Sequence, residues 1–110
     1  GNTLSGILNQ RSQDMLAASN WNVVQYSVLL MMFARAAGLE AGELVHVVAD
    51  AHIYDRHIPI VEMILKNPQY PAPKLIVDEG VKDFYAFTKD SFSLEGYRYN
   101  EFTDKIPVAI

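Results

Sequence analysis

The sequence has no cysteine among its 110 residues, so it offers neither a disulfide nor a thiol nucleophile. Positive charge is also scarce, because nine Lys and Arg residues stand against 13 Asp and Glu and give a formal net charge of −4. A nucleic-acid partner requires a basic face, so we expect none here. A single anionic ligand needs only local positive charge and is not excluded by this balance.

Long hydrophobic runs are missing as well. The apolar stretch 23–34 is too short to cross a bilayer and contains Gln25 and Tyr26. The sequence shows no signal peptide with a basic start and a small-residue cleavage site. With no membrane segment and no cysteine, we expect no membrane partner and a cytoplasmic location.

The composition that remains is globular, with 50% hydrophobic and 20% charged residues. A chain of this length is expected to fold as a single domain, here residues 1–110, around one core. Residues 3–9 alternate weakly between apolar and polar and predict a strand. Residues 44–49 form an apolar run that predicts a second, well-buried strand.

Two helices are predicted between and after these strands. Residues 23–37 are apolar on nearly all sides, which predicts a buried helix that Asn20 or Asn22 could cap. Pro59 suits the first turn of a second helix that ends near Lys66.

The last third of the chain is predicted to be less regular. Residues 74–77 predict a short strand, and 83–99 predict a layer of short strands and turns rich in aromatic side chains. Strands and helices mix without a clean βαβ period, so the predicted class is α+β, a mixed sheet packed with helices.

Polar residues interrupt the apolar pattern at 10–14, at Asn22 and at 50–54. Unpaired charge is costly in a buried segment, so three such interruptions favour a shared polar site over isolated ion pairs. The guanidinium of Arg11 and the hydroxyl of Ser12 suit a phosphate or carboxylate. A salt bridge between Arg11 and Asp14 is the structural alternative.

Other polar residues allow both a binding and a structural interpretation. Asn22 can read the edge of a pyrimidine, or it can cap the predicted helix. His52 and Tyr54 share one face of a strand and can hold a sugar hydroxyl, or they can pair within the core. His46 is predicted to be a hydrogen-bonded core histidine.

The remaining acidic and imidazole groups give no metal prediction. Asp50, Asp55 and Glu62 are interpreted as a solvated face. His52 and His57 do not have the spacing typical of a zinc site, so no metal is expected.

Taken together, these segments resemble the carboxy-terminal part of the thymidylate synthase and deoxycytidylate hydroxymethylase family. The resemblance runs in order from about Leu4 to the last residue. The matching strings are QRSQD at 10–14, WN at 21–22, GLE at 38–40, GELVH at 42–46, DAHIY at 50–54 with His57, PKL at 73–75, FSLEGY at 92–97 and PVAI at 107–110.

This resemblance implies a methyltransferase of nucleotide metabolism that converts dUMP to dTMP. The cosubstrate would be 5,10-methylenetetrahydrofolate, and the assembly would be a homodimer. The implied dUMP-binding residues are Gln10, Arg11, Ser12, Gln13, Asp14, Asn22, His52, Ile53 and Tyr54. The implied folate-binding residues are Asp14, Trp21, Ala109 and Ile110.

Within these sets the resemblance also implies individual roles. Arg11 and Ser12 would bind the phosphate, and Asn22 the uracil edge. His52 and Tyr54 would hold the 3′-hydroxyl of the deoxyribose. Asp14 would contact the pterin and a backbone amide of the nucleotide pocket, whereas Ala109 and the carboxylate of Ile110 would close over the folate.

The sequence departs from the family pattern in several ways. Gln13 stands where Cys or Asn is usual, and 17–22 replaces a Leu-Gly-x-Pro-Phe-Asn stretch near the folate site. More importantly, the nucleophilic cysteine is absent, so no catalytic residue is assigned and the chain alone is expected to be inactive. The abrupt start at Gly1 leads us to expect part of a larger protein, associating as a dimer or higher oligomer.

Two alternatives remain open. A deoxycytidylate hydroxymethylase usually has Asp at the position of Asn22, and an amide suits uracil better than an acid does. A non-catalytic nucleotide-binding or interaction module is the alternative that involves no chemistry.

Overall fold

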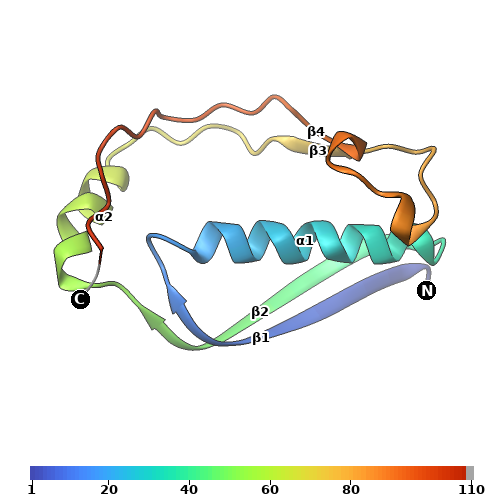
Figure 1. Cartoon of the computed structure of the whole chain (residues 1–110), viewed down its shortest axis with the longest axis horizontal. Coiled ribbons are helices and arrows are strands. Elements are labelled where there is room, and N and C mark those ends of the chain that lie inside the picture. The colour runs from blue at the N-terminus through green and yellow to red at the C-terminus, as the bar shows by residue number, and fades with distance from the viewer. Residues whose placement is uncertain (109–110) are drawn as a thin grey trace.

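A computed structural model describes residues 1–108 of the chain. It begins with the long strand β1 (Thr3–Asp14), followed by the long helix α1 (Ser19–Ala36) and a second long strand, β2 (Glu40–His52). The two strands pair in parallel, and α1 lies along them (Figure 1). The predicted mixed class is therefore confirmed, but β1, α1 and β2 form a βαβ unit that the prediction missed.

Alternation along the strands decides which side of this pair faces α1. Leu44 and Leu30 both lie against Gly6, where an added Cβ would be 3.8 and 3.6 Å from their side chains. Residues one position out of phase, such as Val45 and Val47, are exposed on the opposite face. The core of this half therefore lies between α1 and one face of the strand pair.

Gly42 marks a close approach between the two strands. A Cβ at this position would lie 2.5 Å from the Ser5 hydroxyl and 2.6 Å from a methyl carbon of Thr3. The register shifts nearby, between Leu4 and Gly6. Only glycine leaves the room that this irregular pairing needs.

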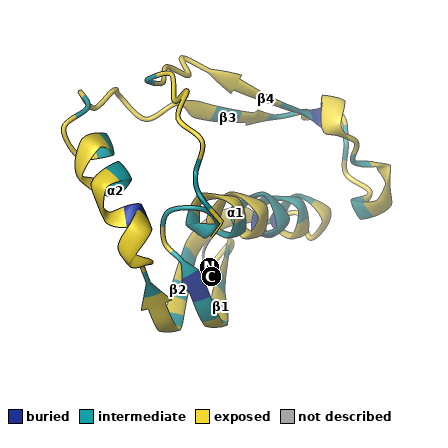
Figure 2. Cartoon of the chain, turned by 60° about the vertical axis from the view of Figure 1, so that its left-hand side comes forward, coloured by how far each residue is buried: buried dark blue, intermediate teal, exposed yellow. Residues whose placement is uncertain are grey.

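The prediction that α1 is buried on nearly all sides is wrong for the described chain. Among its residues only Leu30 and Ala34 are buried, and Figure 2 shows exposed and half-buried surface along most of the helix. The reason is geometric: two strands cover one side of the helix, and apolar residues on its other sides, such as Trp21 and Val24, stay exposed among residues 1–108 even though Phe84 packs on Phe33.

Neither predicted asparagine caps α1. The helix begins at Ser19, and its N-cap residue Ala18 makes no side-chain cap hydrogen bond. The carboxylate of Asp14 instead accepts hydrogen bonds from the backbone N–H groups of Leu16 and Ala17, at 3.0 and 3.1 Å. This turn starts the helix before Asn20 and Asn22, which lie inside it.

After β2 the chain forms a turn of 3-10 helix, η1 (Asp55–His57), and the short helix α2 (Ile58–Ile64). Pro59 lies in the first turn of α2 as predicted, because a proline there loses no helical hydrogen bond. The predicted strand β3 (Lys74–Val77) is confirmed, and it pairs antiparallel with β4 (Phe92–Glu95).

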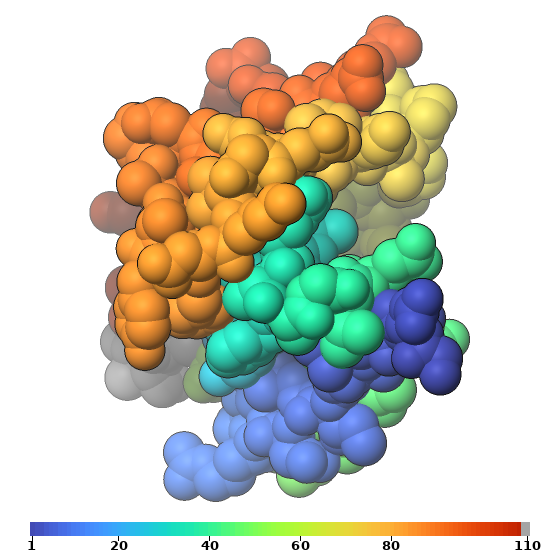
Figure 3. Space-filling view, turned by 90° about the vertical axis from the view of Figure 1, so that its right-hand side faces the viewer, coloured from blue at the N-terminus to red at the C-terminus, as the bar shows by residue number. Residues whose placement is uncertain are grey.

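Between β3 and β4 the chain makes two short 3-10 turns, η2 (Phe84–Ala86) and η3 (Lys89–Ser91). The prediction of short strands and turns in 83–99 is thus confirmed for the turns and for one strand. The ring of Phe84 stacks on Phe33 with centroids 4.9 Å apart, which ties this segment to α1. Figure 3 shows the same segment, in orange, packed over the C-terminal end of the helix.

None of the helices in the described range 1–108 combines the length and apolarity needed to cross a bilayer.

Candidate functional site

The parallel register brings two of the predicted polar segments together. Ser12 is opposite Asp50, and Asp14 is opposite His52, at the carboxyl ends of β1 and β2. Ligands of mixed and parallel sheets commonly bind at this edge, because the loops that follow the strands leave it open. The interruptions at 10–14 and 50–54 therefore meet in space, as the prediction of one polar site requires.

The third interruption, Asn22, joins them through Gln10. The Gln10 amide donates hydrogen bonds from Nε2 to the backbone carbonyl of Ser12 at 3.0 Å and to Oδ1 of Asn22 at 3.3 Å. Its oxygen Oε1 accepts a hydrogen bond from Nε2 of His46 at 2.8 Å. The prediction of a hydrogen-bonded His46 is confirmed, and its partner is a site residue.

Asp50 connects Ser12 with His52. The Ser12 hydroxyl donates to Oδ2 of Asp50 at 3.1 Å, and His52 Nδ1 lies 3.3 Å from the Asp50 carbonyl and 3.5 Å from Oδ2. Both oxygens are acceptors, so this contact places the proton of a neutral imidazole on Nδ1. His52 Nε2 is then an acceptor, which a ligand hydroxyl can use.

Aromatic rings continue the site from β2 into η1. His52 and Tyr54 make an edge-to-face contact at 5.1 Å, and Tyr54 makes another with His57 at 5.5 Å. The strand ends at His52, so the pair meets across the strand end and not along one strand face. Tyr54 is 41% exposed, and Ile53 between the two rings is also exposed.

Arg11 lies apart from Ser12. The two residues are consecutive in β1, so their side chains leave the strand on opposite sides. Arg11 is exposed beside Asn9, Val47 and Ala49, which line a pocket of 210 Å³ on the face opposite α1. No ion pair joins Arg11 to Asp14 or to another described residue, so the predicted salt-bridge alternative is not what the structure shows.

Two further predicted residues have contrasting environments. Gln13 is 3% exposed, and its Nε2 has no hydrogen-bond partner among the described residues. Trp21 is 75% exposed in the first turn of α1. Because successive helical residues are about 100° apart, Trp21 and Asn22 point in different directions.

The end of the described chain is fastened to η1. His57 donates from Nε2 to the carbonyl of Pro107 at 2.8 Å, and Arg56 donates from Nη1 to the carbonyl of Val108 at 2.9 Å. His57 is 2% exposed, and its Nδ1 lies 3.9 Å from Oδ2 of Asp14. The predicted tail residues Ala109 and Ile110 lie outside the described residues.

Sequence reasoning missed four contributors to this site: Asp50, His46, Arg56 and His57. Asp50 was assigned to a solvated face, and it is indeed exposed, yet it binds both Ser12 and His52. The sequence signal for the tail contacts was the Arg56–His57 pair, which follows the polar segment. This pair did not indicate that its partners lie about fifty residues later in the chain.

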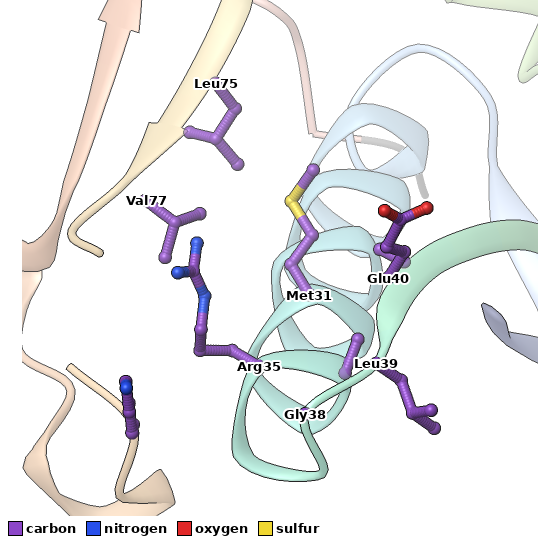
Figure 4. Close-up of a pocket in the computed structure, with 10 residues that line it drawn as sticks. Met31, Arg35, Gly38, Leu39, Glu40, Leu75 and Val77 are labelled. Atoms are coloured by element: carbon purple, nitrogen blue, oxygen red, sulfur yellow. The ribbon is translucent and has the colours of Figure 1, made fainter. Parts of the chain in front are cut away.

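A separate pocket of 590 Å³ lies near the C-terminal end of α1. Figure 4 shows Met31 and Arg35 directed from the helix toward Leu75 and Val77 of β3. At 1.5 Å rise per residue, Met31 is roughly 13 Å along the helix from Asn22, so this pocket is distinct from the polar site.

The acidic and imidazole groups of the polar site do not form a metal-binding cluster. Within the described part of the chain, no group of three or more His, Asp or Glu residues is arranged to hold an ion.

Comparison with known proteins was made for the whole sequence. The family model described as thymidylate synthase matches residues 1–110. This chain belongs to the thymidylate synthase family. The mixed fold expected from the resemblance is also found in a solved family structure, thermostable thymidylate synthase A from Bacillus subtilis. Its TM-score is 0.83 at 37% identity, over 89% of this chain and 36% of that one.

Curated members of the family match at similar levels. Thymidylate synthase from Bacillus licheniformis is 42% identical over 98 residues, covering 89% of this chain and 35% of that protein. Thymidylate synthase from Bacillus phage phi3T is 41% identical over 91 residues, covering 83% of this chain and 33% of that protein. The chain thus spans about a third of the length of the thymidylate synthases it matches.

Proposed function

We propose that this chain is the carboxy-terminal part of a thymidylate synthase and supplies its nucleotide-binding groups. The complete protein would methylate dUMP to dTMP reductively, with 5,10-methylenetetrahydrofolate as cosubstrate. One observation carries the proposal: the register of β1 and β2 and the Gln10–Asn22 hydrogen bond gather chemically distinct groups at one strand edge. These groups match the three parts of a pyrimidine nucleotide.

The base would be read by Asn22. Its amide offers one acceptor and one donating NH₂ group, which complement the N3–H and O4 of uracil. Asn22 is half-buried between α1 and the strands, where a hydrogen bond to a ligand is less exposed to competition from water.

The sugar would be held by His52 and Tyr54. The Nδ1 contact with Asp50 leaves His52 Nε2 as an acceptor for the 3′-hydroxyl. The Tyr54 hydroxyl can donate or accept beside it, and the ring contact at 5.1 Å keeps the two groups together. Ile53 and Gln13 would complete the nucleotide pocket.

The phosphate would be bound by Arg11 and Ser12. Arg11 carries an exposed guanidinium with no ion pair to a described residue, so its donors are available for an oxyanion. The Ser12 hydroxyl now donates to Asp50 and would rotate toward the phosphate. Because the two side chains leave the strand on opposite sides, Arg11 would have to reach around the strand edge.

The folate would lie near Asp14 and Trp21, with the tail residues Ala109 and Ile110 closing over it. Asp14 already accepts backbone hydrogen bonds through Oδ1, so Oδ2 is the oxygen left for a pterin N–H. The tail contacts with Arg56 and His57 fix Pro107 and Val108 to η1, whose His57 lies 3.9 Å from this carboxylate. Closure of such a tail would exclude water from the reaction.

The nucleophile would come from a part of the protein outside this sequence. A cysteine thiolate must add to C6 of uracil before C5 can attack the folate methylene, and this chain has no cysteine. The chain alone would therefore bind without turnover, and the complete enzyme would work as a homodimer.

Complementation tests this proposal. Mixing the chain with an amino-terminal thymidylate synthase segment that carries the cysteine should restore release of tritium from C5 of labelled dUMP. The matched control is His52→Phe, which keeps a ring but removes the acceptor for the 3′-hydroxyl and should raise the KM for dUMP. A folded complex that binds dUMP without releasing tritium would indicate a binding module, and release only from labelled dCMP would indicate a hydroxymethylase.

A further inference from the structure

We propose that His46 is a positioning residue that fixes the amide of Asn22 through Gln10 and thereby makes the site accept uracil and reject cytosine. This inference rests on the proposed function, since it explains how the proposed dUMP site would choose its base. It is carried by the hydrogen bonds that link His46, Gln10 and Asn22 across β2, β1 and α1. These hydrogen bonds form a relay from His46 to Asn22.

The backbone carbonyl of Ser12 determines the orientation of the Gln10 amide. The backbone carbonyl of Ser12 is an acceptor only, and the Gln10 amide group approaches it at 3.0 Å. Nε2 of Gln10 must therefore face this carbonyl, because the opposite orientation would place two oxygens in contact. The backbone of β1 thus assigns the two ends of the Gln10 amide.

His46 reinforces the same orientation from the other strand. With Nε2 of Gln10 on the Ser12 carbonyl, Oε1 faces His46 Nε2 at 2.8 Å and needs a donor there. The imidazole must carry a proton on Nε2 to meet that need. All three groups are half-buried between the strands and α1, so water does not readily replace a lost partner.

Asn22 is the last residue of this hydrogen-bonded relay. The second N–H of Gln10 points to Oδ1 of Asn22 at 3.3 Å, so Asn22 presents its oxygen on this side. Rotating the Asn22 amide by 180° would bring its NH₂ group against the NH₂ group of Gln10, where neither can accept. The relay therefore disfavours the flipped amide.

This orientation matters because a free asparagine can pair with either base. Uracil presents an N3–H donor and an O4 acceptor, whereas cytosine presents an N3 acceptor and a 4-amino donor. A flipped Asn22 would complement cytosine as well as the unflipped one complements uracil. Discrimination therefore depends on what holds the amide, and His46 supplies one of the two anchors of Gln10.

The experiment compares dUMP and dCMP binding by calorimetry in the complete protein, where the cysteine-bearing segment is joined to this chain. His46→Phe keeps a planar ring but donates no hydrogen bond, and it should reduce the preference for dUMP by about fivefold to tenfold. His46→Gln retains an N–H donor and should recover most of the preference. Ser27→Ala is the matched control, because it removes one side-chain hydrogen bond from α1, to the Val23 carbonyl, away from the site.

The outcomes distinguish a failure of the relay from a failure of the proposed function. If the wild-type protein binds dUMP and His46→Phe keeps the preference within twofold, the relay is wrong and the proposed function stands. If the wild-type protein binds neither nucleotide, both ideas fail. Should His46→Phe not fold, Gln10→Met removes both relay contacts at similar volume and should give the same loss of preference.

A readout that needs no nucleotide tests the geometry itself. ¹⁵N NMR of His46 should show the neutral ring protonated on Nε2, as the contact with Gln10 Oε1 demands. Protonation on Nδ1 alone would overturn the relay.

Discussion

Replacing Arg56 with alanine should weaken the attachment of the tail of this chain to η1. Two side-chain hydrogen bonds hold the described part of the tail, which ends at Val108: Arg56 to the Val108 carbonyl at 2.9 Å and His57 to the Pro107 carbonyl at 2.8 Å. A charged donor at an exposed site contributes about 1.5 kcal/mol and a neutral one about 1 kcal/mol. Together they correspond to roughly 1–2% of detached tail, which Arg56→Ala would raise to about 15%.

Carboxypeptidase digestion measures this population, because the enzyme cleaves an extended chain that has left its contacts. Release of Val108 should be about tenfold faster in Arg56→Ala than in the wild type, as follows from the detached fractions above. Lys66→Ala is the control, since it removes an exposed cation near the end of α2 that makes no hydrogen bond or ion pair to a described residue. Equal valine release from the Arg56 variant and the wild type, with unchanged circular dichroism, would refute the assignment of Arg56 as an anchor.

Three further predictions follow from the fold and the site. Gly42→Ala places a Cβ within 2.6 Å of two β1 side chains and should lower the stability of the folded chain by about 1–3 kcal/mol. Gly6→Ala, with ordinary contacts at 3.6 and 3.8 Å, should change it by less than about 1 kcal/mol; equal melting temperatures for the two variants would contradict this reasoning. Asn22→Asp in the complete protein should move the preference from dUMP toward dCMP in competition binding, and an unchanged ratio would remove Asn22 from base recognition. The 110-residue chain should run as a dimer or larger species in light scattering because Val45 and Val47 leave an apolar strand face uncovered, and a monodisperse monomer would argue against that.

Local sequence patterns predicted the elements whose ends are marked by local chemistry. Prolines at 71 and 73 isolate the strand 74–77, and Pro59 marks the first turn of α2. The two long strands were underestimated, because 10–14 and 50–52 look too polar for a strand. These polar segments nevertheless belong to β1 and β2, because the backbones of the two strands form hydrogen bonds with each other. Such pairing joins residues far apart in the sequence, so a local pattern does not reveal it.

The burial of α1 shows a different limit. Its apolar residues, such as Trp21 and Phe33, indicate a helix that needs cover on several sides. The pattern cannot say whether the same stretch of chain supplies that cover. Within 1–108 the strands cover one side of α1 and Phe84 packs on Phe33, while residues such as Trp21 stay exposed. The sequence thus showed which residues of the helix are apolar, but not which of them residues 1–108 would bury.

The sequence singled out the groups that we propose to face the ligand, but not the groups behind them. His52, Tyr54 and Asn22 lie in the polar interruptions of apolar segments, but their chemistry alone allowed a structural role as well as a binding role. Asp50 and His46 hold these groups in place, and their roles depend on the register that sets Asp50 opposite Ser12. That register joins residues 38 positions apart, so no local pattern could reveal it.

The tail contact also closes a ring in the chain. The His57–Pro107 hydrogen bond joins residues 50 positions apart, and the hydrogen bond from Asn100 to the Pro68 carbonyl joins residues 32 positions apart inside that ring. With the inner contact made, closing the tail orders only about twenty free residues, which lowers the entropic cost by roughly 0.8 kcal/mol. Asn100 therefore favours the docked tail without touching it, and a ligand that disturbed the Tyr70–Arg98 region beside Asn100 would loosen the tail by lengthening the ring.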